Sequence, residues 1–235
     1  MIHVRSARLV GMVMVVLTAC ALSVAAQDRV LIRVWDLQPH GTEIPEALEA
    51  IAERVDGGFL PVGLEYEPGR PITVVYTQNI NAPISEVSIV TIEDLAELEE
   101  RMNELLRSGN TPMGMARHDG GLTLLTVRST IPMQSWGLLT VPLNVQSIER
   151  AIRSQEARGF SAWALSDYQG DAWILFMRES DEAPERSAVV QSYLLDADNY
   201  IPGIDSAVSN RLIPWGLTIN EGEIFVQYTR TSTTP

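Results

Sequence analysis

Apolar residues along this chain alternate between a strand-like and a helical pattern, and residues 135–178 show the order most clearly. Residues 135–141 and 172–178 are short runs rich in apolar and aromatic residues, as is typical of strands. Between them, residues 145–158 place apolar side chains near one face of a helix, and Gly159 follows where that helix would end. A further strand at 160–166 leads into a turn. This stretch therefore predicts a strand, a helix and two more strands.

Three other stretches repeat this order. Their first strands are expected at 29–37, 86–91 and 188–195, and their helices at 44–55, 92–106 and 199–210. Gly58 and Gly109 are expected to end the first two of these helices. Thr91 and Asp94 have the spacing of a capping box. The Pro-Gly pair at 202–203 predicts that the last helix is short or broken.

A short motif marks the second strand and the hairpin of every stretch. It consists of Pro or Ala, any residue, Gly or Ala, a larger apolar residue, and a second Gly six residues after the first Gly or Ala. The copies are Pro61-Val62-Gly63-Leu64 with Gly69, Pro112-Met113-Gly114-Met115 with Gly120, Ala162-Trp163-Ala164-Leu165 with Gly170, and Pro214-Trp215-Gly216-Leu217 with Gly222. The second glycines are 51, 50 and 52 residues apart, which indicates a tandem repeat. We expect repeats at 28–80, 84–130, 135–180 and 187–231, with hairpin glycines that mostly have positive φ.

The third strands of the first three repeats are apolar on both faces, so both faces of these strands must be covered. A helix that crosses back over the sheet makes the first two strands parallel, and a tight hairpin makes the third antiparallel to the second. With the third strand in the middle, every neighbouring pair is antiparallel. The positions predicted to be buried on these strands are Val74, Val75, Leu124, Leu125, Ile174 and Leu175. The predicted fold class is therefore α+β, with four tandem βαββ units, mainly antiparallel sheets, and helices packed on the outer face.

Two segments of the third repeat resemble a known family. These are Gly159-Phe160-Ser161-Ala162-Trp163 and Leu175-Phe176-Met177-Arg178. They are similar to a small bacterial βαββ domain family of unknown function, which has a Gly-Trp-Glu-Leu-Val-like second strand and a third strand ending in Phe-Lys-Arg. Phe160 stands where the family has Trp, and Met177 stands where it has Lys. The resemblance covers most of the mature chain by architecture, and it implies a fold without an activity.

The first 26 residues have the pattern of a secretory signal peptide. Arg5 and Arg8 precede an apolar run over 9–24, and small residues at 23–26 suit a signal peptidase. Leu17-Thr18-Ala19-Cys20 also matches a lipobox, in which a signal ending at 19 leaves Cys20 as the lipidated first residue. Both readings predict export, either to the periplasm or outside the cell, or as a membrane-anchored lipoprotein. An uncleaved anchor is disfavoured because the apolar run is short for a membrane span.

Composition narrows the chemistry that the mature chain can support. Cys20 is the only cysteine and the chain has no lysine, which excludes disulfides, other thiolate sites and Schiff-base chemistry. Removal of Arg5 and Arg8 takes the formal net charge from −13 to −15, and so acidic a chain repels nucleic acid. We therefore expect no nucleic-acid partner, and no membrane contact except through a possible N-terminal lipid.

The polar residues do not have the spacing of a catalytic or metal site. His40 and His118 belong to different repeats, and neither has a second His at ligand spacing. His118 with Asp119 could be a base and its orienting acid, but the turn-forming residues around them favour a solvated hairpin turn. The acidic residues within 93–104 are typical of a solvated helix face. The sequence therefore predicts a protein that is not an enzyme and has no cofactor and no metal.

Aromatic residues in the second half of the chain suggest a candidate ligand pocket. Trp163, Trp173, Trp215 and Phe225 lie on predicted hairpin strands, where they could line a pocket for a flat or apolar ligand or could belong to the core. The first functional hypothesis is a non-catalytic exported repeat protein that binds an envelope protein or takes part in an envelope assembly. The alternative is a small-ligand binder that uses these aromatic residues, and an enzyme is third.

Overall fold

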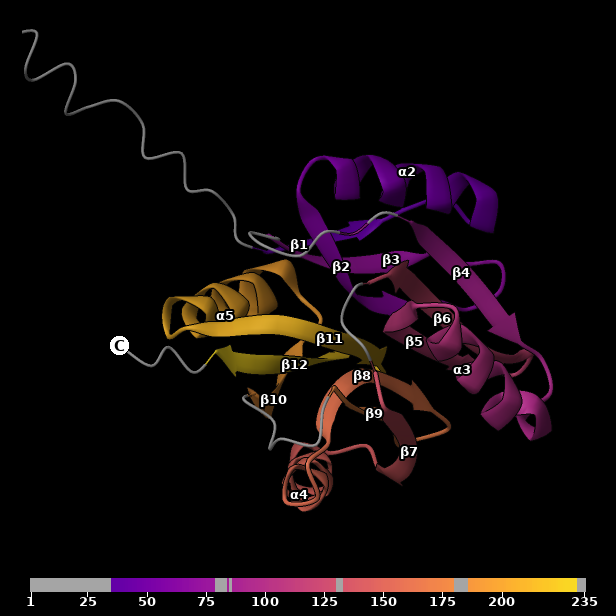
Figure 1. Cartoon of the computed structure of the whole chain (residues 1–235). Coiled ribbons are helices and arrows are strands. Elements are labelled where there is room, and N and C mark those ends of the chain that lie inside the picture. The colour runs from indigo at the N-terminus through magenta and orange to yellow at the C-terminus, as the bar shows by residue number, and fades with distance from the viewer. Residues whose placement is uncertain (1–34, 79–83, 85, 130–132, 180–185, 232–235) are drawn as a thin grey trace, which may run out of the picture. The chain divides into compact units, whose positions relative to one another are not determined.

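The order strand, helix, strand, strand occurs four times in the structure, a computed structural model that describes residues 35–78, 84, 86–129, 133–179 and 186–231. Each occurrence forms one three-stranded sheet with its helix, which we call a unit (Figure 1). The units comprise β1 (Trp35–Pro39), α2 (Ile44–Asp56), β2 (Phe59–Glu65) and β3 (Thr73–Gln78); β4 (Val87–Ile92), α3 (Leu98–Arg107), β5 (Asn110–His118) and β6 (Gly121–Arg128); β7 (Ser135–Pro142), α4 (Val145–Glu156), β8 (Ser161–Tyr168) and β9 (Asp171–Arg178); and β10 (Arg186–Leu194), α5 (Ala197–Ser209), β11 (Leu212–Asn220) and β12 (Glu223–Thr231). The fold class is α+β, as predicted.

The third strand of each unit lies in the middle of its sheet. The orders are β1-β3-β2, β4-β6-β5, β7-β9-β8 and β10-β12-β11, and every pair is antiparallel. The six positions predicted to be buried on these strands are at most 3% exposed. Alternate residues on these strands point to opposite faces of the sheet. Val75, Leu124 and Leu175 belong to a hydrophobic cluster shared by all four units. Val74 and Leu125 belong to a cluster between units 1 and 2, and Ile174 belongs to one between units 3 and 4.

Three helices begin and end within two residues of the predicted bounds. The exception is α3, which begins at Leu98 rather than at 92, because Ile92 still belongs to β4 and a 3-10 turn at Leu95–Glu97 precedes the helix. Gly58, Gly109 and Gly159 follow the first three helices with positive φ, as expected of glycines at these positions. The capping box predicted at Thr91 is wrong. Thr91 belongs to β4, and its Oγ1 lies 3.0 Å from that of Thr123. Asp94 instead accepts a hydrogen bond from the Ala96 amide and begins a 3-10 turn that leads into α3.

The last helix is also longer than the sequence predicted. α5 is continuous for 13 residues with Pro202 inside it. Asp196 caps its N-terminus through a hydrogen bond from the Asp198 amide. Pro202 lies in the second turn, where the missing N–H costs one helical hydrogen bond, and Ile204 and Ala207 are buried against the sheets. Tertiary packing therefore maintains a helix that local propensity disfavours.

The prediction that the second glycines of the motif lie in the hairpins and mostly have positive φ is confirmed. Gly69, Gly170 and Gly222 have φ of 83°, 83° and 85°. In unit 2, positive φ falls on Gly121 at 134° rather than on Gly120. A Cβ on Gly121 would lie 2.2 Å from the Ile92 carbonyl oxygen, so this glycine also allows a close backbone approach.

The second strands of the four units lie beside one another in a closed cycle. β2 contacts β5, β5 contacts β8, β8 contacts β11, and β11 contacts β2. Figure 1 shows the four helices at the periphery of this part of the chain and these strands nearer its middle. The expectation that helices lie outward and that sheets pack against sheets is therefore confirmed.

The repeated motif supplies the close contacts within this cycle. Each second strand has a register shift at the motif, so that the residue after Pro61, Pro112, Ala162 or Pro214 bulges from the ladder. A Cβ on Gly114 would lie 2.7 Å from the Leu64 amide nitrogen of unit 1. A Cβ on Gly63 would lie 3.2 Å from the Leu217 amide nitrogen of unit 4. The motif glycines thus let neighbouring units approach backbone to backbone.

Side chains near the first strands link neighbouring units on the outside of the cycle. Trp35 Nε1 donates to Asp205 of α5, 2.8 Å away, and thereby joins unit 1 to unit 4. Trp136 Nε1 donates to Asn103 of α3, 3.1 Å away. The Ala188 amide donates to Glu156 of α4, 2.8 Å away. Each first strand in these pairs meets the helix of the preceding unit, counting unit 4 as preceding unit 1.

Candidate functional site

The ends of the second strands that lead into the hairpins meet at one end of the cycle. Three hydrogen bonds cross between units at equivalent positions there. The Arg117 amide donates to Ser166 Oγ at 2.8 Å, the Asp167 amide to Thr218 Oγ1 at 2.9 Å, and the Ile219 amide to Glu65 Oε2 at 3.2 Å. The corresponding acceptor position in unit 2 is Ala116, which has no polar side-chain atom. These links run from unit 2 to 3, from 3 to 4, and from 4 back to 1.

The link at Glu65 differs from the other two because its acceptor is a carboxyl group rather than a hydroxyl group. Glu65 Oε2 accepts a hydrogen bond from the Ile219 amide and also lies 3.3 Å from Thr218 Oγ1. Burial, followed by the negative charge of Asp167, raises the pKa of Glu65 to about 7, and the two hydrogen bonds offset this only in part. Glu65 therefore exchanges its proton near neutral pH.

Asp167 lies beside Glu65 and is held by unit 4. Its Oδ1 accepts from Thr218 Oγ1 at 2.6 Å, and its Oδ2 accepts from Asn220 Nδ2 at 2.9 Å. Burial raises the pKa of the Asp167 carboxyl group, while these hydrogen bonds favour its charged form. The carboxylate is consequently fixed in position at the boundary of units 3 and 4.

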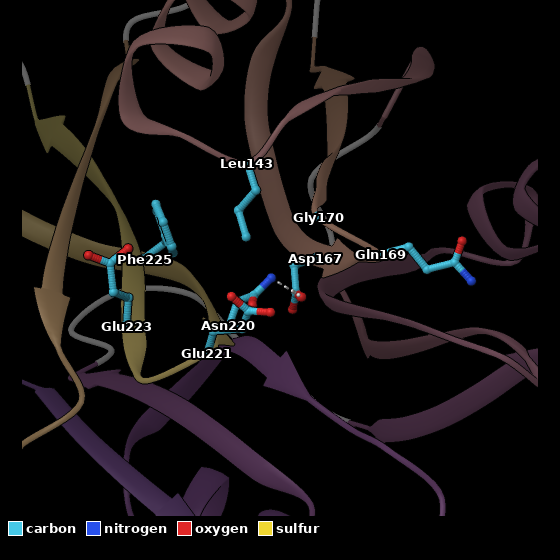
Figure 2. Close-up of a pocket in the computed structure, with 8 residues that line it drawn as sticks. All are labelled: Leu143, Asp167, Gln169, Gly170, Asn220, Glu221, Glu223 and Phe225. Atoms are coloured by element: carbon cyan, nitrogen blue, oxygen red, sulfur yellow. Dashed lines mark hydrogen bonds between the residues drawn. The ribbon is translucent and has the colours of Figure 1, made fainter.

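A cleft of about 660 Å³, which we call the 3–4 cleft, opens between units 3 and 4 at this end (Figure 2). Its lining residues are Leu143, Asp167, Gln169, Gly170, Asn220, Glu221, Glu223 and Phe225. Figure 2 shows the Leu143 side chain pointing toward the hydrogen-bonded pair of Asn220 and Asp167, with the Phe225 side chain to the left of Leu143 in this view. Among the described residues that line this cleft, the charged ones are all acidic.

A second cleft of about 440 Å³, the central cleft, is lined by residues of all four units. Its lining includes Glu65, Tyr66, Glu67, Pro68, Arg70, Arg117, His118, Asp119, Asp167, Tyr168, Gln169 and Ile219. Arg117 lies over the Tyr168 ring at 4.2 Å, and its Nη1 donates to the carbonyl oxygens of His118 and Gly121. Asp167 and Gln169 line both clefts, so the two clefts meet at the end of β8.

His40 and His118 are both hydrogen-bonded within their own units, and His40 Nε2 lies 2.7 Å from the Tyr76 hydroxyl oxygen. His118 is 6% exposed, which corrects the expectation of a solvated turn residue. Its Nε2 lies 2.9 Å from Thr123 Oγ1, and its Nδ1 accepts from the Gly120 amide. Burial, and then the charge of Arg117, lower the pKa of His118, so the ring is neutral at neutral pH. Asp119 accepts from the Tyr168 hydroxyl group at 2.8 Å.

The four predicted aromatic pocket residues lie in different surroundings. Trp163 and Trp215 are the bulged residues of their strands and meet edge to face, with ring centroids 5.5 Å apart. Trp173 lies 5.4 Å from the Arg117 guanidinium group. Phe225 belongs to a different hydrophobic cluster from Trp163, and it contributes to the 3–4 cleft. The structure therefore brings Trp163 and Trp215 together and places Phe225 in a cleft. Cys20 lies outside the described residues.

Glu65, Asp167 and Thr218 were not among the site residues predicted from the sequence. A usable signal was nevertheless present in the aligned repeats, because the residue after the motif is Glu65, Ala116, Ser166 or Thr218. Three of these four equivalent positions hold a small residue, so the single carboxyl group at Glu65 indicates a different role. That role becomes evident only in the structure, where these equivalent positions face a neighbouring unit.

Among the described residues, no group of three or more His, Cys, Asp or Glu side chains is arranged to hold a metal ion. In the same part of the chain, none of the helices is long and apolar enough to cross a membrane. Comparison of the chain with models of protein families, with curated proteins and with solved structures found no match.

Proposed function

We propose that this chain is an exported, non-catalytic binding protein built from four tandem βαββ copies. The copies span 28–80, 84–130, 135–180 and 187–231 and follow a signal peptide over 1–26, or a lipoprotein signal ending at 19. Three observations support the repeat: the same order of elements, the same bulge, and equivalent links between units. The motif residues serve packing between units, which is the role expected of a scaffold.

The hairpin end of the cycle is the proposed binding face, and the 3–4 cleft is its principal site. Its volume is within the range of roughly 300–1,000 Å³ that is usual for small-molecule sites. Leu143 and Phe225 provide an apolar wall, while Asp167, Glu221 and Glu223 provide negative charge. This combination favours a small organic cation, whose apolar body contacts the wall and whose positive group faces the carboxylates. The 3–4 cleft is the observation that supports this proposal most strongly. Among the predicted aromatic pocket residues, Phe225 lines this cleft.

The test is a ligand capture with matched charge variants. Purified protein starting at Gln27 is incubated with a mixed metabolite extract, and the retained compounds are identified by mass spectrometry. Glu221 and Glu223 are exposed, so their replacement by Gln removes charge from the cleft without disturbing the core. Glu99→Gln with Glu100→Gln on α3 is the control with the same change in net charge. Retained organic cations that are lost only with the 221/223 variant support the proposal. Retention of nothing, or equal retention by both variants, contradicts it.

An envelope-assembly role is the second candidate, and one surface feature favours it. Leu194 and Leu195 are adjacent at the end of β10 and are 60% and 43% exposed. Large apolar side chains exposed next to each other are typical of contact sites for other proteins. Capture of an envelope protein by the parent chain and its loss with Leu194→Ser and Leu195→Ser together would support this role. Equal capture by both proteins would contradict it.

A further inference from the structure

Three units share one small cluster of polar side chains. Glu65 lies at the end of β2 in unit 1, Asp167 near the end of β8 in unit 3, and Thr218 in β11 of unit 4. Thr218 is fully buried, and its Oγ1 lies 2.6 Å from Asp167 Oδ1 and 3.3 Å from Glu65 Oε2. The contact that closes the cycle between units 4 and 1 therefore includes two carboxyl groups and one hydroxyl group.

The number of protons in this cluster depends on Glu65. A hydroxyl group has one proton and two acceptor positions. Thr218 Oγ1 accepts from the Asp167 amide and uses its proton on Asp167 Oδ1 at the shorter distance. Its remaining acceptor position is available to Glu65 Oε2. When Glu65 is protonated, it can donate to Thr218 Oγ1, and when it is ionised, it competes with Asp167 for the single Thr218 proton. The protonated cluster is the fully hydrogen-bonded one.

The surrounding charges also favour the protonated form of Glu65. On the hairpin of Glu65 itself, Glu67 is negative and pairs with Arg70 at 2.9 Å. From unit 3, Asp167 adds negative charge, and both Glu67 and Asp167 raise the pKa of Glu65. From unit 2, Arg117 donates to backbone carbonyl oxygens, burial lowers the pKa of His118, and Asp119 accepts from Tyr168. From unit 4, Thr218 and Ile219 bring no charge. Ionised Glu65 thus lacks a cationic partner at hydrogen-bond distance among these groups.

We propose that Glu65, Thr218 and Asp167 form a proton-dependent latch between unit 1 and units 3 and 4. With a proton on Glu65, the latch is closed and the contact of β2 with β11 is at its strongest. Loss of that proton leaves two neighbouring carboxylates competing for the Thr218 hydroxyl group and weakens the contact. Glu65 itself lines the central cleft, so the same proton alters the charge at the hairpin end of the cycle.

The molecule contains an internal control for this inference. The Arg117 amide donates to Ser166 Oγ in the equivalent link between units 2 and 3. That acceptor does not titrate between pH 5 and 8, whereas the acceptor of the Ile219 amide is the Glu65 carboxyl group. Both amides lie at corresponding positions of the cycle. A difference between them with pH therefore reports on Glu65 rather than on the whole fold.

Hydrogen exchange tests the latch by comparing the Ile219 and Arg117 amides between pH 5 and 8, with rates corrected for intrinsic exchange. Protection of Ile219 is expected to fall relative to Arg117 by up to about tenfold per pH unit as Glu65 loses its proton, because one proton is linked to closure. Glu65→Gln should abolish this difference between the two amides. Glu99→Gln, which changes an exposed carboxylate on α3 that does not act on Glu65, should leave it in place.

A carboxyl titration of the unchanged protein gives a second reading that does not depend on any variant folding. In ¹³C-labelled protein, the Glu65 carboxyl resonance should move with a midpoint near pH 7. The proposal is overturned if that midpoint lies near the usual value for Glu. It is equally overturned if Ile219 and Arg117 lose protection in parallel, or if Glu65→Gln retains the difference between them.

Discussion

Addition of a single methyl group at Gly114 tests how closely the units approach. An alanine Cβ there would lie 2.7 Å from both the amide nitrogen and the Cβ of Leu64, and 2.9 Å from the Gly63 carbonyl carbon. Two of these atoms are backbone, so β2 and β5 must separate to accept the methyl group. Gly114 does not have positive φ, which means that backbone strain does not contribute.

The expected loss is about 1–3 kcal/mol from overpacking, partly offset by the roughly 0.4–1 kcal/mol that Gly→Ala gains from the unfolded chain. A net loss of about 1–2 kcal/mol corresponds to a fall in melting temperature of roughly 2–8 °C for a domain of this size. Denaturant unfolding at constant pH measures the free-energy change directly.

Gly216→Ala is the matched control at the equivalent position of unit 4. A Cβ there meets the Leu165 amide nitrogen at 3.5 Å, an ordinary contact distance, and unit 3 already has Ala164 at this position. This variant should be as stable as the parent protein, or slightly more stable. If Gly114→Ala were as stable as Gly216→Ala, the close approach of β2 and β5 described above would be wrong.

Other variants address the hairpins, the core, the pH dependence and the leader. Gly121→Val should cost about 2–4 kcal/mol in denaturant unfolding, because it combines positive φ with a backbone clash at Ile92; an unchanged midpoint would refute the turn. Leu175→Ala should cost roughly 2–5 kcal/mol, and a loss below 1 kcal/mol would place that strand at an edge. Because the folded pKa of Glu65 is raised from 4.5 to about 7, its contribution to stability is complete below pH 4.5 and is lost as the pH rises to about 7. The stability of the parent protein relative to Glu65→Gln should therefore fall by about 3 kcal/mol across that window, and a constant difference would contradict the assignment. Cys20→Ser should block processing or release the protein from membranes if Cys20 is lipidated; unchanged fractionation and processing would make Cys20 part of a cleaved signal peptide.

Local patterns were sufficient for the elements and for the order within each sheet. The helical period of 145–158 and the stop at Gly159 predicted α4, and strands apolar on both faces predicted the central positions of β6 and β9. These features depend on neighbouring residues and on the need to cover an apolar strand. The misplaced features, such as the cap at Thr91 and the glycine with positive φ at 121, depend on one or two residues at an element boundary.

The closed cycle and the polar cluster could not be derived from the sequence because they depend on residues far apart along the chain. Gly63 meets Leu217, and Glu65 meets Thr218 and Asp167, across contacts that no local period encodes. The repeated Gly or Ala is visible as a pattern in the sequence, but the pattern does not show which backbone it approaches. Its role in close packing between units becomes evident only with the units in place.

The contact between units 1 and 4 is the most direct test of this account, because it closes the cycle and holds the latch. The Gly63 α-protons and the Leu217 amide proton are separated by more than 150 residues in the sequence, yet their backbones are in contact. A strong nuclear Overhauser cross-peak between them at pH 5 is the predicted result. Absence of that cross-peak, with the one between Gly114 and Leu64 present, would show that unit 1 does not meet unit 4.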